Sequence, residues 1–300
     1  MDRLDAMRIF VAVARLGSFA QAARQLRLSP SVATRSVAQL EDQLGLMLLT
    51  RTTRSLRLTD RGEIFLESCQ QILDDIDNAQ RRVRGESAEP RGELRLAAPI
   101  VFGRLHVLPI VNRMLSEHPN LSVRLSLSDR NVHLVDDGID IAVRIGNLVD
   151  SAMIAVKLGE VSRVVIASPA YLKAHGVPKS PTKLVDLDII AFESLDATNE
   201  WRFKQNETVR VAPRLTVNSA DAAIAAAEAG VGIARTLSYQ VKDHVQDGRL
   251  VTILEKFTPP PSAVSAIYLA RRLASANIGA FVKMTRDHFR DSPIEPIKEW

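Results

Sequence analysis

The sequence predicts an α/β chain with three parts in order: a small helical domain that ends in a short hairpin, a long connecting helix, and a bilobed α/β module. Apolar residues recur at helical spacing through most of residues 4–84. From residue 93 onward, strand-like and helix-like segments alternate. A length of 300 residues is typical of about two domains. We expect the parts to span 1–59, 60–92 and 93–300.

Two short helices are expected first. Residues 4–15 place apolar side chains on one face, and Gly17 can end that helix in a left-handed conformation. Ser18 can cap a second helix that has Gln21 at its third position, which is a capping-box pattern. Phe19 and the small alanines after it form a face that another helix can approach closely.

A third helix follows after a short joint. Ser29 is a good N-cap, Pro30 suits the first helical position, and the helix is expected to run to about Gln43. Its outer face is small and polar, with Ser31, Thr34, Arg35, Ala38 and Gln39. This arrangement favours a helix-turn-helix whose second helix enters the major groove of DNA. The alternative is an ordinary three-helix bundle with a solvated polar face.

A basic hairpin is expected next, because residues 47–59 alternate like two short strands. From Arg24 to Arg61 there are seven arginines and three acidic residues, so this segment carries +4, the net charge of the whole chain. A local basic patch on a balanced protein favours phosphate binding. We expect Arg51, Thr52 and Arg54 to contact the DNA backbone or the minor groove.

Taken together, these residues resemble the LysR-type transcriptional regulators. The matching segments are Phe19-Ala20-Gln21-Ala22-Ala23, Leu28-Ser29, Thr34-Arg35, Leu40-Glu41, Leu44-Gly45, Arg51-Thr52 and Leu58-Thr59, followed by Gly62. Thr34 departs modestly, because the family commonly has serine there. The resemblance extends over the chain and implies a winged helix-turn-helix, a linker helix and a bilobed periplasmic-binding-protein-like α/β effector domain. It implies DNA-binding residues at Ser29, Ser31, Thr34, Arg35, Gln39, Arg51, Thr52 and Arg54.

Residues 60 to about 84 predict one long helix, which Asp60 could cap. Its apolar residues are spaced 4, 3, 4, 3 and 4 apart, as in a two-stranded helical pair: Phe65, Cys69, Ile72, Ile76, Ala79 and Val83. The alternative is a helix packed on its own domain. We favour pairing with a second copy, because a small domain offers little surface on which a long helix can pack. A dimer also presents two reading helices to two DNA half-sites. A polar hinge follows at 85–92.

The remaining chain predicts a parallel α/β sheet in each of two halves, with a short helix at 132–137. Two similar halves suggest a hinged module that closes on a ligand. Segments similar to the family include Leu94-Arg95-Leu96-Ala97-Ala98-Pro99, Asp140-Ile141-Ala142-Val143-Arg144-Ile145-Gly146 and Ala229-Gly230-Val231-Gly232-Ile233. The resemblance implies two chain crossings. We therefore expect lobe I at 93–162 and 267–300, and lobe II at 163–266.

Ligands of open α/β sheets bind at the carboxyl ends of strands. The expected effector residues are Pro99, Ile100, Val101, Phe102, Ser128, Arg144, Gly146, Phe192, Asn218 and Ser219. The first of these open a helix whose free N–H groups attract anions. Many relatives have serine or threonine there, so Pro99 and Ile100 argue against carboxylate binding through a hydroxyl. Arg144 is either the counter-ion of an acidic effector or part of a salt bridge to Asp129 or Asp140.

Other patterns exclude several classes of protein. No apolar run reaches the roughly 18 residues of a membrane span, and the N-terminus lacks a signal-peptide pattern, so we expect a cytoplasmic location. Cys69 is the sole cysteine, which excludes an internal disulfide and favours a core residue over a redox sensor. The six histidines lack metal-ligand spacing, and we expect no metal or cofactor. The Gly230–Gly232 segment indicates a helix stop. Trp201 and Phe203 indicate core or cleft wall.

The sequence therefore predicts a transcriptional regulator that binds double-stranded DNA and is controlled by a small-molecule effector, with an anion as one candidate. Its expected partners are a second copy, in a homodimer or homotetramer, and RNA polymerase, with no membrane. A cytoplasmic ligand-binding module without a DNA role is the alternative. An α/β enzyme is disfavoured, since no nucleophile elbow, phosphate-binding loop or paired carboxylates occur in a supporting context.

Overall fold

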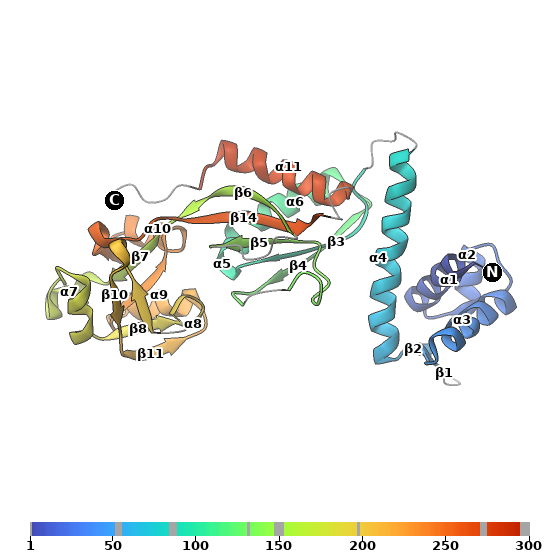
Figure 1. Cartoon of the computed structure of the whole chain (residues 1–300), viewed down its shortest axis with the longest axis horizontal. Helices are drawn as coiled ribbons and strands as arrows, with labels where there is room; N and C mark the ends of the chain where they lie inside the picture. Colours follow the sequence, from blue (N-terminus) through green and yellow to red (C-terminus); the bar gives the residue numbers. More distant parts are fainter. Residues whose placement is uncertain are drawn as a thin grey trace. The chain divides into compact units, whose positions relative to one another are not determined.

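The computed structural model describes residues 2–51, 56–83, 89–130, 133–146, 153–196, 199–270 and 275–294. The chain divides into two compact units, Met1–Ala88 and Glu89–Trp300. The first is helical with one short hairpin, and the second contains two five-stranded sheets with helices packed on them (Figure 1). No helix among the described residues is long and apolar enough to cross a membrane.

The three expected N-terminal helices are confirmed as α1 (Arg3–Leu16), α2 (Phe19–Gln25) and α3 (Pro30–Leu44). Gly17 follows α1 in the left-handed region, at φ 61°. The Ser18 hydroxyl accepts the N–H of Gln21 at 3.3 Å, and the Ser29 hydroxyl accepts the N–H of Val32 at 3.3 Å. These bonds satisfy backbone donors that the first turn of a helix leaves unpaired.

The hairpin pairs β1 (Leu49–Arg51) with β2 (Leu56–Leu58) in antiparallel register, as expected. Its tip, residues 52–55, lies outside the described residues. A carboxylate anchors the first strand to α3: Glu41 is 6% exposed, and its Oε1 accepts the N–H groups of Leu48 at 2.8 Å and Leu49 at 3.0 Å. Glu41 therefore fixes the position of the hairpin relative to α3.

The start of α4 (Asp60–Val83) corrects one expectation. Thr59, and not Asp60, makes the capping bond, because its hydroxyl accepts the N–H of Gly62 at 2.9 Å and donates to the Met47 carbonyl at 2.8 Å. Gly62 permits a close backbone approach, since a Cβ there would lie 2.0 Å from the Leu48 carbonyl oxygen. The hairpin, its cap and α4 thus form one tightly joined corner.

The expected dimer seam on α4 is wrong at Phe65 and Cys69, because this part of the helix packs on α1. The rings of Phe10 and Phe65 lie 5.7 Å apart, and Cys69 is fully buried in the domain's own core. Burial raises the pKa of the Cys69 thiol to about 12, which fits a core residue and leaves no reactive thiolate at neutral pH.

A neighbouring face of α4 is exposed. Ile64 is 63% exposed and Ile72 is 40% exposed, with the exposed Ser68 midway between them. Ile76 is half-buried. Ala79 and Val83 belong to α4, but their side chains lie outside the described set. The apolar residues therefore divide into an inner stripe against α1 and an outer stripe of Ile64, Ser68 and Ile72.

The first sheet of the α/β unit has the order β4-β3-β5-β14-β6. Its strands are β3 (Gly92–Ala98), β4 (Leu121–Leu127), β5 (Ile141–Ile145), β6 (Met153–Val161) and β14 (Ser262–Leu269). Strand β3 is parallel to β4 and β5, but β14 is antiparallel to β5 and β6. The expected all-parallel sheet is therefore wrong, because β6 leaves this lobe and β14 returns to it in the opposite direction.

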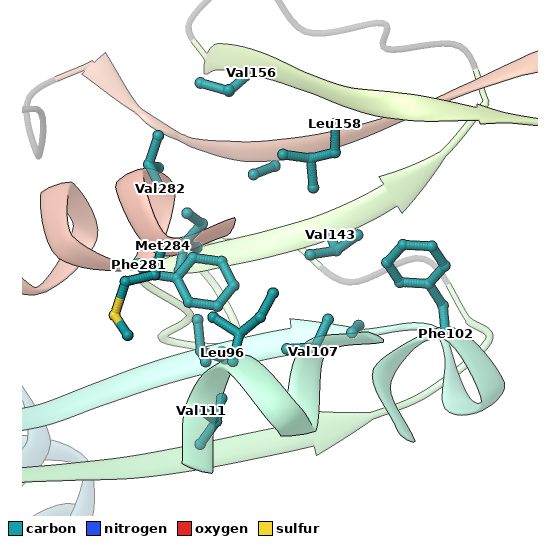
Figure 2. Close-up of a cluster of buried hydrophobic side chains, with 14 of the residues drawn as sticks. Leu96, Phe102, Val107, Val111, Val143, Val156, Leu158, Phe281, Val282 and Met284 are labelled. Carbon is teal, nitrogen blue, oxygen red and sulfur yellow. The ribbon is translucent and has the colours of Figure 1, made fainter. Parts of the chain in front are cut away.

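The expected helix after β3 forms as α5 (Ile100–Phe102), a π-helical turn (Gly103–Val107) and α6 (Leu108–Glu117). The final helix, α11 (Ala276–Asp291), packs beside α6. Figure 2 shows the resulting core, in which Phe281 and Met284 of α11 meet Leu96 of β3 and Val143 of β5. The short helix expected at 132–137 is instead a turn at 134–138; residues 131–132 lie outside the described part.

The second sheet has the order β11-β8-β12-β7-β13 and is also mixed. Its strands are β7 (Arg163–Ala167), β8 (Ile189–Phe192), β11 (Pro213–Val217), β12 (Ile233–Leu237) and β13 (Val251–Ile253). The helices around it are α7 (Pro169–His175), α8 (Glu193–Asp196), α9 (Ala220–Glu228) and α10 (Ser238–Gln246). A hairpin of β9 (Glu200–Arg202) and β10 (Thr208–Arg210) and 3₁₀ turns at Pro181–Asp186, Lys204–Asn206 and Glu255–Phe257 complete the lobe.

Both faces of this sheet are covered. Val165 and Ala167 of β7 face a core that includes Trp201 and Phe203, whereas Val164 and Ile166 face the core under α9 and α10. This alternation follows from the two-residue period of a strand. The placement of Trp201 and Phe203 in a core is confirmed. Gly230 lies past the end of α9 at φ 76°, consistent with the expected helix stop.

The chain crosses between the lobes at Ser162, where two hydrogen bonds connect Ser162 to Ser238. The Ser162 N–H donates to the Ser238 hydroxyl at 3.2 Å, and the Ser238 N–H donates to the Ser162 carbonyl at 2.9 Å. The return strand β14 begins at residue 262, so 262–266 belong to the sheet of lobe I and not to lobe II as expected.

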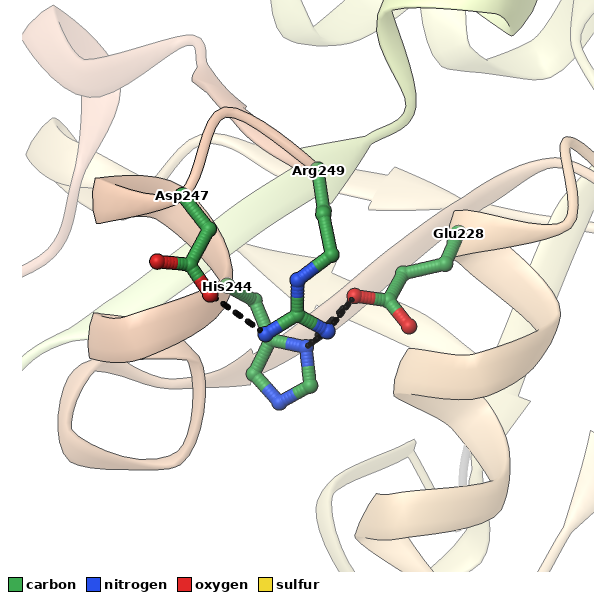
Figure 3. A network of polar contacts seen from close by, with 4 residues as sticks. All are labelled: Glu228, His244, Asp247 and Arg249. Atoms are coloured by element: carbon green, nitrogen blue, oxygen red, sulfur yellow. Dashed lines mark hydrogen bonds and ion pairs between the residues drawn. The ribbon is translucent and has the colours of Figure 1, made fainter.

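A polar network on lobe II joins α9 to the end of α10 (Figure 3). Oε1 of Glu228 lies 2.6 Å from Nδ1 of His244 and 2.6 Å from the guanidinium of Arg249, which also contacts Asp247 at 3.0 Å. These partly exposed ion pairs fix the turn before β13. Their contribution to stability is modest, because water screens such pairs.

We predict that Glu41→Ala loosens the corner between α3 and the hairpin of the N-terminal unit. It leaves two buried N–H groups unpaired, which lowers the local opening free energy by about 2–4 kcal/mol. Hydrogen exchange of the full chain, followed over residues 41–51, measures this change. Asp42→Ala, which removes an exposed carboxylate from the next position, is the matched control. Equal protection in the two variants would contradict the anchoring role of Glu41.

Candidate functional site

Helix α3 carries a polar outer face opposite a buried one. Ala33, Val37 and Leu40 are buried against the core of the unit. The expected reading residues lie on the other side: Ser31, Arg35 and Gln39 are exposed, and Thr34 is half-buried. The polar face of α3 that the sequence predicts is therefore exposed, as contact with a DNA groove requires.

The joint before α3 is held by short polar contacts. The Ser29 hydroxyl accepts the Val32 N–H and lies 2.9 Å from the Ser31 hydroxyl. Arg27 adopts a left-handed conformation, at φ 57°, and turns the chain between α2 and α3. Ser29 therefore has a capping role and holds Ser31 at the N-terminal end of the reading face.

The hairpin beside α3 is described only in part. Arg51 lies in β1, but its side chain is outside the described set, and Thr52 and Arg54 are outside the described residues. Arg57 of β2 is exposed, as are Arg24 and Arg27 near the helix joint. Exposed guanidinium groups around a polar helix face create a positive field that suits the phosphate backbone.

A cleft of about 170 Å³ lies in the α/β unit, where strand ends of the two lobes meet. Four of the predicted effector residues line it: Pro99, Ser128, Arg144 and Phe192. Lobe I contributes the ends of β3, β4 and β5, whereas lobe II contributes the start of β7 and the ends of β8 and β12. The strand-end rule thus predicted four of the residues that line this cleft.

Six predicted effector residues do not line the cleft. Val101 and Phe102 are buried in cores, because α5 packs between the sheets of the two lobes. Gly146 lies just beyond β5 in a left-handed conformation, at φ 109°. Asn218 is exposed, and the Ser219 hydroxyl caps α9 by accepting the Ala222 N–H at 3.4 Å. Ile100 is also outside the lining.

The expected anion position at the start of α5 is occupied by the protein itself. Oδ1 of Asp129 accepts the Ile100 N–H at 3.1 Å, so this donor is not free for a ligand. Burial raises the pKa of the Asp129 carboxyl, the bond from Ile100 lowers it, and nearby Asp221 raises it. Asp140, the other carboxylate offered to Arg144, accepts the Arg95 N–H at 2.8 Å.

Sequence reasoning missed several cleft residues, including Asp129, Arg130, Arg163, Tyr239 and Gln240. Asp129 and Arg130 directly follow β4, so the strand-end rule applied one or two residues further along would have found them. Arg163, Tyr239 and Gln240 carried no such signal, because only the crossing at Ser162 and the unpredicted helix α10 bring them to the cleft.

Tyr239 links the cleft to an aromatic cluster between the lobes. Its ring lies 5.4 Å from that of Phe102 and 5.9 Å from that of His106, and Phe289 of α11 completes the group. Burial lowers the pKa of His106 to about 4, with further contributions from His288 and Lys242, so the imidazole is neutral at pH 7. Tyr239 therefore lines the cleft and also belongs to the aromatic packing between the two lobes.

Within the described part of the chain, no group of three or more histidine, cysteine, aspartate or glutamate side chains is placed to hold a metal ion. The cleft is lined by arginines, one carboxylate, hydroxyls and apolar side chains. This composition suits recognition of a small polar molecule.

Comparison with known proteins gives matches over both units. Residues 4–63 match the bacterial regulatory helix-turn-helix family of the lysR type, and residues 87–290 match the LysR substrate binding domain. An HTH-type transcriptional repressor of Pseudomonas aeruginosa is 34% identical over 298 residues, covering 98% of this chain and 94% of its own. The regulator DmlR of Escherichia coli K12 is 32% identical over 292 residues, covering 96% and 95%.

Solved structures agree with these matches. CrgA, a LysR-type transcriptional regulator from Neisseria meningitidis, has 27% identity and a TM-score of 0.60, covering 95% of this chain and 98% of its own. The full-length virulence activator AphB of Vibrio cholerae has 26% identity and a TM-score of 0.58, with coverage of 95% and 98%. The chain belongs to the LysR-type transcriptional regulators, with an N-terminal helix-turn-helix that binds DNA and an α/β effector-binding domain.

Proposed function

We propose that α3 reads base edges in the major groove through Ser31, Thr34, Arg35 and Gln39. The observation that carries this proposal is the division of α3 into a buried apolar face and a small, polar outer face. A helix with such a face fits the groove, and an arginine can bond guanine bidentately. Ser29, at the N-terminal end, is positioned to meet a phosphate while it caps the helix.

Non-specific affinity is proposed to come from the hairpin. Arg51, Thr52 and Arg54 would contact phosphates or the minor groove, and the exposed Arg57 adds charge to the same element. These contacts position the protein without reading the sequence, so they contribute equally on every DNA. The +4 net charge of the segment from Arg24 to Arg61 supports this role.

Pairing through α4 is proposed for the exposed stripe of Ile64, Ser68 and Ile72, in place of the seam that includes Phe65 and Cys69. Large apolar side chains on the outer face of a long helix are covered when a second copy packs there. The homodimer then presents two reading helices to two half-sites. Contacts between α/β units would extend the assembly to a homotetramer.

The α/β unit is proposed to bind a small anionic effector in its cleft, where Arg130, Arg144 and Arg163 contribute positive charge. Binding shifts the equilibrium between lobe arrangements by its differential affinity for them, and so changes the presentation of the DNA-binding units. The protein would act in the cytoplasm, contact RNA polymerase at its target promoters, and have no catalytic activity of its own. A ligand-binding module without a DNA role is the competing proposal.

We predict that Arg35→Ala removes sequence preference without abolishing binding to random DNA. The lost base contact is worth about 1–3 kcal/mol, which is about 5- to 150-fold in discrimination. Gel-shift affinities on an operator selected from random-sequence DNA, and on unselected DNA, measure this ratio. Gln43→Ala, an exposed change two turns further along α3, is the control.

The same assay separates the hairpin from the helix. Arg54→Ala should weaken binding to both DNAs by a similar factor and should reduce the salt dependence, because a phosphate contact is lost.

Retention of full operator preference by Arg35→Ala would show that α3 is not the reading helix. No binding of the unaltered protein to any DNA at low salt would favour the ligand-binding module.

We predict that Ile72→Lys separates paired chains. A lysine in the apolar stripe would bury an unpaired charge in the helix pair, at a cost of about 3–5 kcal/mol. Sedimentation velocity of the full chain, together with operator affinity, measures the outcome. Gln43→Lys adds the same charge to an exposed site on α3 and controls for it. An unchanged oligomer with unchanged operator affinity would rule out the outer face of α4 as the pairing surface.

A further inference from the structure

A second cavity, of about 320 Å³, lies along the edge strand β13 of lobe II and shares no lining residue with the cleft between the lobes. Leu172 of α7 and the following Val177 and Pro178 form one apolar wall. Ile253 of β13 and Phe257 of the next 3₁₀ turn form the other. We call this cavity the β13 groove.

The β13 groove leaves apolar side chains in contact with water. Val177 is 60% exposed and Val251 is 39% exposed. In the described part of the chain, β13 pairs with β7 on one side and has no strand on the other. Proteins usually cover or charge such an edge, because another extended segment can join it. The groove therefore suits an extended segment with apolar side chains.

The sequence after α11 has a three-residue repeat. Two prolines stand three residues apart, at 293 and 296, and Ile294, Ile297 and Trp300 have the same spacing. A polyproline II helix has three residues per turn, so these three apolar side chains share one face of it. Segments of this kind are already extended before they bind, and they dock in apolar, aromatic-lined grooves. Residues 295–300 thus have the pattern of a recognition segment.

This segment starts close to the crossings between the lobes. Ile294 packs on the core of lobe I, where a Cβ on Gly159 of β6 would lie 3.0 Å from the Ile294 Cβ. Figure 1 shows the C-terminal end of α11 on the side of lobe II. Phe257 lies seven residues before Val264, the strand partner of Gly159, and is thus at most about 25 Å from it.

The length of the segment matches this separation. Residues 295–300 lie outside the described residues, and six residues of polyproline II span about 19 Å. The long side chain of Trp300 extends the reach further. A segment that leaves Ile294 toward lobe II therefore meets the β13 groove at its Phe257 end.

The charges of the groove and of the segment are complementary. Lys179 and Lys256 line the groove together with Glu255, whose carboxylate accepts the Thr252 hydroxyl. Residues 295–300 contain two glutamates and one lysine. The groove has more positive charge and the segment more negative charge. Exposed ion pairs contribute little affinity, so these charges orient the segment and the apolar face holds it.

We propose that residues 295–300 dock in the β13 groove of their own chain as a polyproline II segment, with Ile297 and Trp300 against its apolar walls. The segment then ties α11 of lobe I to the edge strand of lobe II. It covers Val177 and Val251, and it limits how far the lobes turn about their crossings. This strap does not depend on the proposed DNA and effector roles.

Acrylamide quenching of tryptophan fluorescence in the full chain tests the proposal. The chain has two tryptophans and Trp201 is fully buried, so the difference between the unaltered chain and Trp300→Phe reports on Trp300. A docked Trp300 should have a Stern–Volmer constant about tenfold below that of N-acetyltryptophanamide, which corresponds to about 1.4 kcal/mol of docking free energy. A constant equal to that of the free compound would overturn the proposal.

A matched pair of valines assigns the groove. Val177→Asp places a charge in its wall and should raise the quenching constant of Trp300 about tenfold, to the value of the free compound. Val185→Asp is the control, because Val185 is 59% exposed and does not line the groove. Equal quenching constants in the two variants, with native circular dichroism, would place Trp300 on another surface.

Hydrogen exchange of the full chain observes the groove from the other side. Trp300→Ala should speed exchange over residues 251–257, whereas Lys298→Ala, on another face of the same helix, should leave it unchanged. The same exchange rates in both variants would contradict the docking. Shielding of Trp300 that falls as the protein is diluted would assign the segment to a second copy and overturn docking within one chain.

Discussion

The burial of α1 is the constraint on which the DNA-binding unit depends. Phe10 and Val13 are fully buried, and α2, α3 and α4 all pack against this one helix. Because a helix can bury only one side, packing α3 on α1 turns Ser31, Arg35 and Gln39 outward together. The Phe65 side of α4 packs on the same helix, so Ile64 and Ile72 face away from the core of the unit. One core thus sets both the reading face and the outer stripe.

The effector unit depends on a different constraint, the double crossing between its lobes. Strands β6 and β14 run in opposite directions through the same sheet, and the paired bonds between Ser162 and Ser238 hold the first crossing together. This topology brings Arg163 and Tyr239 of lobe II to the ends of β3, β4 and β5. The aromatic group of Tyr239, Phe102 and His106 then makes the cleft wall continuous with the packing between lobes. Tyr239 therefore belongs both to the cleft wall and to the packing between the lobes.

Local patterns predicted most of the elements, because each depended on nearby residues. The caps at Ser18 and Ser29, the end of α1 at Gly17 and the hairpin at 49–58 follow from chemistry within one turn of the chain. The α4 seam failed for a physical reason: a 4-3-4 spacing shows that residues share a face, but not which neighbour covers it. Phe65 packs against Phe10 of α1 and Cys69 lies in the same core, so neither side chain is available to a second copy. The parallel sheets failed likewise, since strand direction depends on where the chain crosses.

The sequence by itself determined the helix-turn-helix, its polar outer face, the basic segment and four residues of the cleft, because periodicity, caps and strand ends are local properties. Only the tertiary structure decided which buried groups remain without partners. Oδ1 of Asp129 accepts the Ile100 N–H, whereas Oδ2 of Asp129 and Nε of Arg163 in the other lobe are buried without a partner among the described residues. Neither fact can be predicted from residue spacing or composition, since both depend on contacts between residues that only folding brings together.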